Sequence, residues 1–145
     1  MHGGSSAEVE RMLASVPLLA TLDGATIRRL ARDGKRRRYA AGETILEEGT
    51  RGVALFIVLS GRVRVEKGPT ATEAALGELG PGEFFGELAL IEEHPRTASV
   101  VAVEETECLL IVAWEFSALL KEHPQIAVPI MRALIARLHR AEHRP

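Results

Sequence analysis

Short β-branched stretches separated by glycine fill the middle of the chain, and this texture constrains the fold more than any other feature of the sequence. Strands of such length, bounded by turn residues, are typical of an all-β sandwich or barrel. The predicted strands are residues 44–46, 53–59, 62–67, 74–79, 98–103 and 108–113. We therefore expect a mainly β fold.

The dipeptide Ser60-Gly61 lies between two of the predicted strands and is a two-residue hairpin signal. Glycine supplies the positive φ that such tight turns demand. In the second of these strands, Val63 and Val65 alternate with charged side chains. We expect the valines to point inward and the charged residues, Glu66 among them, to face solvent.

Helical periodicity is found on both sides of the β region. Residues 9–13 and 25–31 predict short N-terminal helices, and residues 115–122 predict a helix after the last strand. A final helix begins near Pro124, in whose first turn the missing N–H costs little, and Pro129 is expected to kink it. Its apolar side chains recur at helical spacing: Ile126, Ile130, Met131, Leu134, Ile135 and Leu138.

These elements predict an antiparallel β-roll, jelly-roll-like in the manner of a double-stranded β-helix, with N-terminal helices and a C-terminal closing helix. A chain of 145 residues fits one domain, 1–145, in which residues 1–8 are a flexible tail and 115–142 are the closing helices. Hydrophobic residues at 46% and charged residues at 26% suit a folded globular protein.

Charge and hydropathy argue against several classes of partner. The net charge of -2 gives no general attraction to a polyanion, so no nucleic acid is expected. The basic run at 28–38 lacks interleaved aromatic residues and is interpreted as a solvated face. The apolar runs fall short of the roughly 20 residues that span a bilayer, so no membrane partner is expected.

The cysteine and histidine content bears on compartment and metal chemistry. One cysteine, Cys108, cannot form an internal disulfide and is expected to be a buried hydrophobe in a reducing cytosol, which predicts a cytoplasmic protein. The histidines match no compact ligand spacing, so no metal is expected. A metal enzyme of the cupin type would need histidines on strands, and no predicted strand contains one. We expect no catalytic residues.

The segment 84–100 carries the functional signal. Gly86 allows a sharp backbone turn, and the amides that follow it are donors at a helix start, which favour an anion. Arg96 offers a planar fork that can grip two phosphate oxygens. Glu87 accepts hydrogen bonds and is suited to a hydroxyl. Together they indicate a ligand with an anion beside a sugar hydroxyl, and Thr97 adds another hydroxyl.

This segment resembles the phosphate-binding cassette of the cyclic nucleotide-binding domain family, which reads roughly Phe-Gly-Glu-Leu-Ala followed by Pro-Arg and a small residue. The matching residues are Phe85, Gly86, Glu87, Leu88, Ala89, Pro95, Arg96, Thr97 and Ala98. The resemblance extends over about residues 16–139.

The resemblance implies a role for each of these positions. Glu87 would bind the ribose 2′-hydroxyl and Arg96 the exocyclic phosphate oxygens. Gly86, Leu88 and Ala89 would supply backbone contacts.

Further contacts are implied around this centre. Phe85 and Thr97 would complete the binding set, and Ala98 with Val100 would line the pocket wall. Leu134 and Arg137 in the closing helix would contact the base.

The implied function is a cyclic-nucleotide sensor that signals through movement of its C-terminal helix. cAMP is the expected ligand, and cGMP stays open because Thr97 is compatible with either purine. A protein partner or a second copy of the chain could bind the closing helix. The alternative is a ligand-free β-roll interaction module with a vestigial pocket, because a fold can persist after its ligand is lost.

Overall fold

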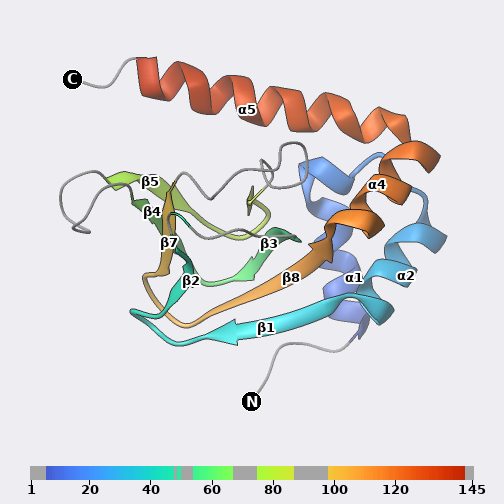
Figure 1. Cartoon of the computed structure of the whole chain (residues 1–145). Helices are drawn as coiled ribbons and strands as arrows, with labels where there is room; N and C mark the ends of the chain where they lie inside the picture. The colour runs from blue at the N-terminus through green and yellow to red at the C-terminus, as the bar shows by residue number, and fades with distance from the viewer. Residues whose placement is uncertain (1–5, 48, 50–53, 67–74, 87–97, 143–145) are drawn as a thin grey trace.

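The computed structural model describes residues 6–47, 49, 54–66, 75–86 and 98–142. Two four-stranded antiparallel sheets pack face to face and are flanked by helices (Figure 1). The first sheet has the order β1 (Lys35–Tyr39), β8 (Thr106–Val112), β3 (Ala54–Ser60) and β6 (Phe84–Phe85). The second has the order β2 (Thr44–Leu46), β7 (Ser99–Ala102), β4 (Val63–Glu66) and β5 (Ala75–Leu79). The predicted antiparallel β-roll with flanking helices is confirmed.

Strand β3 is buried on both faces, because each face meets a different hydrophobic cluster. Leu55 and Ile57 pack into a cluster shared with the helices, which we call the helix core. Phe56 and Val58 point into the space between the two sheets, which we call the roll core. A strand covered on both sides needs a continuous apolar run rather than an alternating one. The unbroken apolar sequence of β3 follows from this position.

The turn at Gly61 passes the chain from one sheet to the other, so the predicted hairpin is wrong. β3 pairs with β8 and β6, whereas β4 pairs with β7 and β5. Gly61 does have the expected positive φ, at 92°. The predicted alternation in β4 is also wrong at one position. Val63 is buried as expected, but Glu66 is buried too, with 5% of its surface exposed.

The helices lie at both ends of the chain and share one apolar core. The N-terminal group is α1 (Ser6–Ser15), the 3-10 turn η1 (Pro17–Leu19) and α2 (Gly24–Asp33). The C-terminal group is α4 (Ala113–Glu122), η2 (Pro124–Ile126) and α5 (Ala127–Glu142). Both groups pack on the outer face of the first sheet through the helix core. The N-terminal and C-terminal helices therefore pack in one common core.

Several predicted boundaries shift. α1 begins at Ser6, inside the segment expected as a tail. Pro124 opens the separate turn η2, and Pro129 is the third residue of α5. In a first turn a proline removes no helical hydrogen bond, so Pro129 fits without the predicted kink. Strands β1 and β6 were not predicted.

None of the helices in the described ranges combines the length and the apolar character that a bilayer crossing requires.

Candidate functional site

The roll core is the apolar cluster that contains Phe85, before the predicted binding segment, and Val100, after it. It is built from side chains of both sheets: Tyr39, Ala54, Phe56, Val58, Val63, Leu79, Phe85, Val100, Ala102, Cys108 and Leu110. At its margin four aliphatic side chains remain partly exposed: Ile45, Leu46, Val65 and Val112. The inner walls are therefore apolar, and part of the hydrophobic surface that packs against them is unburied.

Strand β6 anchors the start of the predicted cassette. It pairs with β3 through Phe56 opposite Phe85 and Ile57 opposite Phe84. Phe84 packs in the helix core, while Phe85 lies in the roll core and stacks on Phe56 with ring centroids 5.0 Å apart. The next residue, Gly86, has φ of 87°. Two buried aromatic rings thus hold the backbone at the point where only glycine turns without strain.

A capped turn sets the approach to β6. The backbone N–H of Gly80 donates to the Glu83 carboxylate at 2.8 Å, and the N–H of Glu83 donates to the carbonyl of Gly80 at 3.1 Å. Gly82, with φ of 88°, supplies the tight bend. This turn docks on β3, because Gly82 N–H donates to Val58 O at 2.8 Å and Val58 N–H donates to Glu83 O at 2.9 Å.

The same turn occurs a second time, before β2. Ala40 N–H donates to the Glu43 carboxylate at 3.0 Å, and Glu43 N–H donates to Ala40 O at 3.0 Å. Gly42, with φ of 88°, makes the bend. This second turn bonds to β7, because Gly42 N–H donates to Ala102 O at 2.7 Å and Ala102 N–H donates to Glu43 O at 2.9 Å. The repeated Gly-Glu dipeptide was the available sequence signal for these capping roles.

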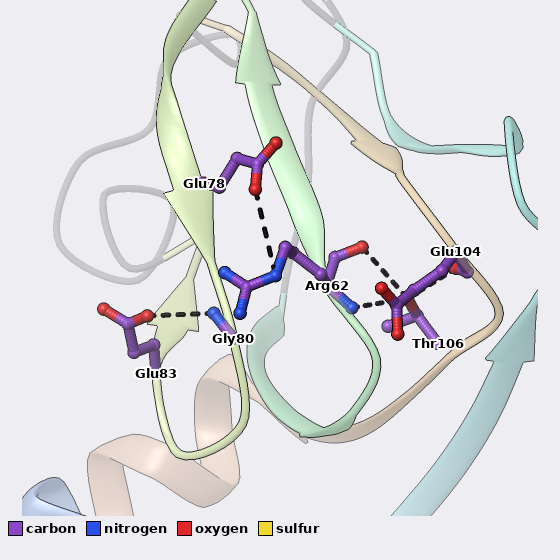
Figure 2. A network of polar contacts seen from close by, with 6 residues as sticks. All are labelled: Arg62, Glu78, Gly80, Glu83, Glu104 and Thr106. Carbon is purple, nitrogen blue, oxygen red and sulfur yellow. Dashed lines mark hydrogen bonds and ion pairs between the residues drawn. The ribbon is translucent and has the colours of Figure 1, made fainter.

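Polar contacts next to the turn at Gly61 connect Arg62 with Glu104 and Thr106, as Figure 2 shows. The buried Thr106 hydroxyl accepts the N–H of Arg62 at 3.2 Å. It donates to the carbonyl of Glu104 at 2.8 Å. The Arg62 guanidinium lies 3.8 Å from the Glu78 carboxylate, and both side chains are well exposed. The buried hydroxyl therefore stabilises the corner more than the surface ion pair does.

Strand β7 follows the predicted cassette in the sequence. Ala98 is half-buried and directly precedes β7. Val100 is buried in the roll core, opposite Val65 of β4 and Leu46 of β2. The cassette is thus bounded by β6 in one sheet and β7 in the other, and both boundaries are anchored in the roll core.

A buried carboxylate near this boundary was missed by sequence reasoning. Glu66 is opposite Ser99, the first residue of β7, and its carboxylate accepts a hydrogen bond from Arg64 Nε at 2.6 Å. A carboxylate removed from water requires such a partner. The Arg-x-Glu spacing places both side chains on the same side of the strand, which was the available signal.

The remaining predicted site residues are divided between described and undescribed parts of the chain. Five lie outside the described residues: Glu87, Leu88, Ala89, Arg96 and Thr97. Leu134 is partly buried in α5. Arg137 belongs to α5, and its side chain lies outside the described part.

Two titratable groups of the roll core have pKa values that burial raises. Burial raises the pKa of the Cys108 thiol to about 12. Burial also raises the pKa of the Tyr39 hydroxyl above its ordinary value. Both groups keep their protons at neutral pH, so neither adds charge to the roll core.

Comparison with known proteins identifies the family. The sequence profile of the cyclic nucleotide-binding domain matches residues 36–123. The chain belongs to the cyclic nucleotide-binding domain family. The cyclic AMP receptor protein of Thermus thermophilus is 40% identical over 109 residues, covering 74% of this chain and 50% of that relative. A cyclic nucleotide-gated potassium channel of Rhizobium etli is 36% identical over 127 residues, covering 88% and 34%.

Solved structures of cyclic nucleotide-binding proteins share the fold. The Thermus thermophilus catabolite activator protein superposes with a TM-score of 0.75 at 37% identity, covering 87% of this chain and 60% of that one. The cAMP-bound PfPKA-R superposes with a TM-score of 0.81 at 26% identity, covering 94% and 46%. This cyclic nucleotide-binding domain spans about half the length of the receptor protein and about a third of the channel.

Proposed function

We propose that this cyclic nucleotide-binding domain is a non-catalytic sensor of a cyclic nucleotide, with cAMP as the expected ligand. The observation that carries the proposal is the anchoring of the cassette: the Phe85–Phe56 stack and the positive φ of Gly86 precede it, and inward-facing Val100 follows it. Relatives with cyclic AMP in their names, and a cAMP-bound structural neighbour, support the choice of ligand.

Within the cassette, Arg96 and Glu87 carry the expected recognition. Arg96 would pair with the exocyclic phosphate, since a guanidinium matches two phosphate oxygens in a bidentate pair. Glu87 would accept the ribose 2′-hydroxyl. Backbone amides at Gly86, Leu88 and Ala89 would complete the anion site.

The remaining contacts would come from the edges of the site. Phe85, Thr97 and Ala98 flank the recognition residues in sequence. Partly exposed aliphatic side chains at the roll-core margin offer apolar surface to the nucleotide. Leu134 and Arg137 of α5 would contact the base.

Calorimetric titration with cAMP tests the phosphate contact. Arg96→Ala should lose roughly 2 kcal/mol or more of binding free energy, about 30-fold in affinity, because the phosphate would lose a charged hydrogen-bond partner. Arg96→Lys should lose less, and Arg11→Ala, at an exposed position on α1, is the matched control. Equal affinities for wild type and Arg96→Ala would remove Arg96 from the site.

The Glu87 assignment has its own test, which uses 2′-deoxy-cAMP. Wild type should prefer cAMP over the deoxy analogue, because only cAMP supplies the 2′-hydroxyl. Glu87→Ala should bind the two ligands equally. A preference that survives the substitution would contradict the assigned contact.

A competition titration between cAMP and cGMP decides the base preference. Displacement of cAMP by cGMP at lower concentration would replace cAMP with cGMP as the ligand. No heat with either nucleotide would instead favour the ligand-free interaction module with a vestigial pocket.

We further propose that α5 transmits the signal. Ile126 is fully buried at its base, whereas Val128, Met131 and Ile135 are 44%, 53% and 52% exposed. Their spacing of three and four residues places them along one stripe of the helix. A ligand shifts α5 only if it binds one helix position better than another, and such coupling is typically about 1 to 3 kcal/mol.

The exposed stripe of α5 supports a protein partner or a second copy of the chain. Sedimentation velocity with and without cAMP tests self-association, and Met131→Glu should abolish any dimer. A monomer under all conditions would leave only a different protein as the partner.

We also propose that residues 1–145 form one domain that acts in the cytoplasm, consistent with the free, buried thiol of Cys108.

A further inference from the structure

Strand β1 concentrates positive charge that the proposed ligand site does not use. Its first four residues are Lys35, Arg36, Arg37 and Arg38, and all four are exposed. With three exposed arginines of α2, residues 28–38 hold seven basic residues and one acidic residue, a formal charge of +6. Because the whole chain carries -2, the remaining residues carry -8. We call Lys35 to Arg38 the basic strand.

The basic strand presents cations on both faces of a sheet edge. β1 is the outermost strand of its sheet within the described residues. Arg36 is opposite Leu109, which lies in the helix core, whereas Arg37 is opposite Cys108, which lies in the roll core. Successive side chains therefore alternate between the two faces, about 3.3 Å apart along the strand.

This spacing favours an extended partner. A peptide in extended conformation has the same rise and the same alternation, so consecutive carboxylates along it can meet consecutive cations of β1. A helical partner rises only about 1.5 Å per residue and turns its side chains around its axis. Only a few residues of a helical partner would therefore contact the basic strand.

Some cations of this face have partners within the chain, and all four residues of the basic strand are nevertheless exposed. Arg36 lies 4.0 Å from Glu107, at the outer limit for an ion pair. Arg32 pairs with its sequence neighbour Asp33, and both side chains are largely exposed. The Arg32–Asp33 pair is weak and screened by salt because both side chains are exposed, whereas the Glu107 carboxylate beside Arg36 is buried. Charged side chains on an edge strand also protect it from pairing with another chain.

Chemistry and size favour an acidic peptide over other anions. Arginine forms bidentate pairs with carboxylates. A long polyanion or an anionic membrane would extend past β1 and meet a chain that elsewhere carries -8. Tyr39, the aromatic residue that ends β1, is buried and offers no platform for base stacking. A short acidic segment would contact only the basic strand and would not reach the acidic remainder of the chain.

We propose that the basic strand is a docking site for an acidic, extended segment of a partner protein. Figure 1 shows β1 and α5 on opposite sides of the molecule. A segment bound along β1 therefore leaves α5 free to move. The site is independent of cyclic-nucleotide binding and does not rest on the function proposed above.

Fluorescence anisotropy with a labelled peptide of eight glutamates tests the proposal. Wild type should bind it with an affinity that falls as salt rises, and Lys35→Glu/Arg38→Glu should weaken binding at least about tenfold. The control, Lys121→Glu/Arg132→Glu, makes the same change in net charge at exposed positions on α4 and α5 and should stay within about twofold. Equal losses in both double variants would reduce the effect to net charge and overturn the proposal.

Two further measurements distinguish the acidic peptide from other anionic partners, and a milder variant controls for misfolding. A short DNA duplex or phosphatidylserine vesicles that bind tighter than the peptide, with the same sensitivity to Lys35→Glu/Arg38→Glu, would replace the acidic peptide as the partner. Amide hydrogen exchange should slow in β1 when the peptide is bound, and unchanged exchange there would overturn the assignment. If the charge reversal unfolds the domain, Lys35→Gln/Arg38→Gln gives the same comparison.

Discussion

The Thr26 hydroxyl lies 3.4 Å from Nε2 of His123, which connects α2 to the residue between α4 and η2. The same hydroxyl donates to the Asp23 carboxylate at 2.5 Å, so it is available to His123 as an acceptor. The Arg29–Glu122 ion pair, at 3.7 Å, connects α2 with the last residue of α4. Through these contacts the N-terminal helices fix the position of His123, after which η2 and α5 begin.

Removing this hydroxyl should loosen the junction. Thr26 is buried, and Thr26→Val keeps its shape while deleting both hydrogen bonds, so we expect a loss of about 1 kcal/mol in the free energy of unfolding. Urea denaturation at pH 7 measures it. Thr26→Ser restores the hydroxyl and should recover most of the loss. A Thr26→Val variant as stable as wild type would show that the contact is energetically neutral.

The pKa of Asp23 gives a second measure of the same contact. The hydrogen bond from Thr26 holds this pKa below its ordinary value of 3.8. A lowered pKa stabilises the fold above that ordinary value, and the contribution disappears as the pH falls through the folded pKa. It is fully present at pH 7. Carboxyl NMR titration should find the pKa of Asp23 higher in Thr26→Val than in wild type.

The two Gly-Glu turns should respond differently to loss of their caps. Glu83→Ala leaves the N–H of Gly80, which is buried, without its acceptor, and should cost roughly 1–3 kcal/mol. Glu43→Ala frees the N–H of exposed Ala40, where water can replace the carboxylate, so the loss should stay below about 1 kcal/mol. Thermal unfolding compares the variants. Glutamine at either position keeps an acceptor, and a loss in Glu83→Gln equal to that in Glu83→Ala would contradict the capping role.

The corner between the sheets should tolerate no side chain. A Cβ on Gly61 would clash with the carbonyl oxygen of Glu105 and with the Thr106 hydroxyl. Gly42 has a similar φ, but a Cβ there would meet nothing within 4 Å. Gly42→Ala should therefore cost only the backbone strain, about 1–2 kcal/mol, and Gly61→Ala distinctly more. Equal losses in chemical denaturation would mean that the corner adjusts freely around the methyl group.

These contacts show where sequence reasoning succeeded and where it failed. The spacing of apolar stretches predicted β2, β4, β5 and β7 and most of β3 and β8, because burial on a sheet produces that pattern directly. β1 was missed because four consecutive charged residues carry no hydrophobic alternation, and an edge strand needs none. β6 has only two residues, too few for any period.

The hairpin error has a different physical origin. The local signal at Gly61 was interpreted correctly as a tight turn, but pairing is decided by strands far away in sequence. Turn geometry alone does not determine whether the next strand returns to its neighbour or joins the opposite sheet. For the cassette, sequence predicted the strand that follows it and the sharp turn at Gly86, whereas the roles of Glu87 and Arg96 stay predictions.

The Cys108 thiol should be unreactive in the folded protein and should make the fold labile at high pH. Burial raises its pKa from the ordinary value of 9.0 to about 12. A raised pKa for a thiol stabilises the fold fully below pH 9.0, and this contribution is lost as the pH rises towards 12. Iodoacetamide should label Cys108 slowly at pH 7.5 and rapidly in denaturant. Fast labelling of the native protein would contradict its burial.

Two-sided burial of β3 makes this strand a common wall of the helix core and the roll core. Neither compartment can come apart without exposing one face of that wall to water. Melting should therefore be all-or-none across the molecule, with a calorimetric enthalpy that equals the van't Hoff value. A perturbation that begins in one compartment is consequently felt in the other as a change in global stability.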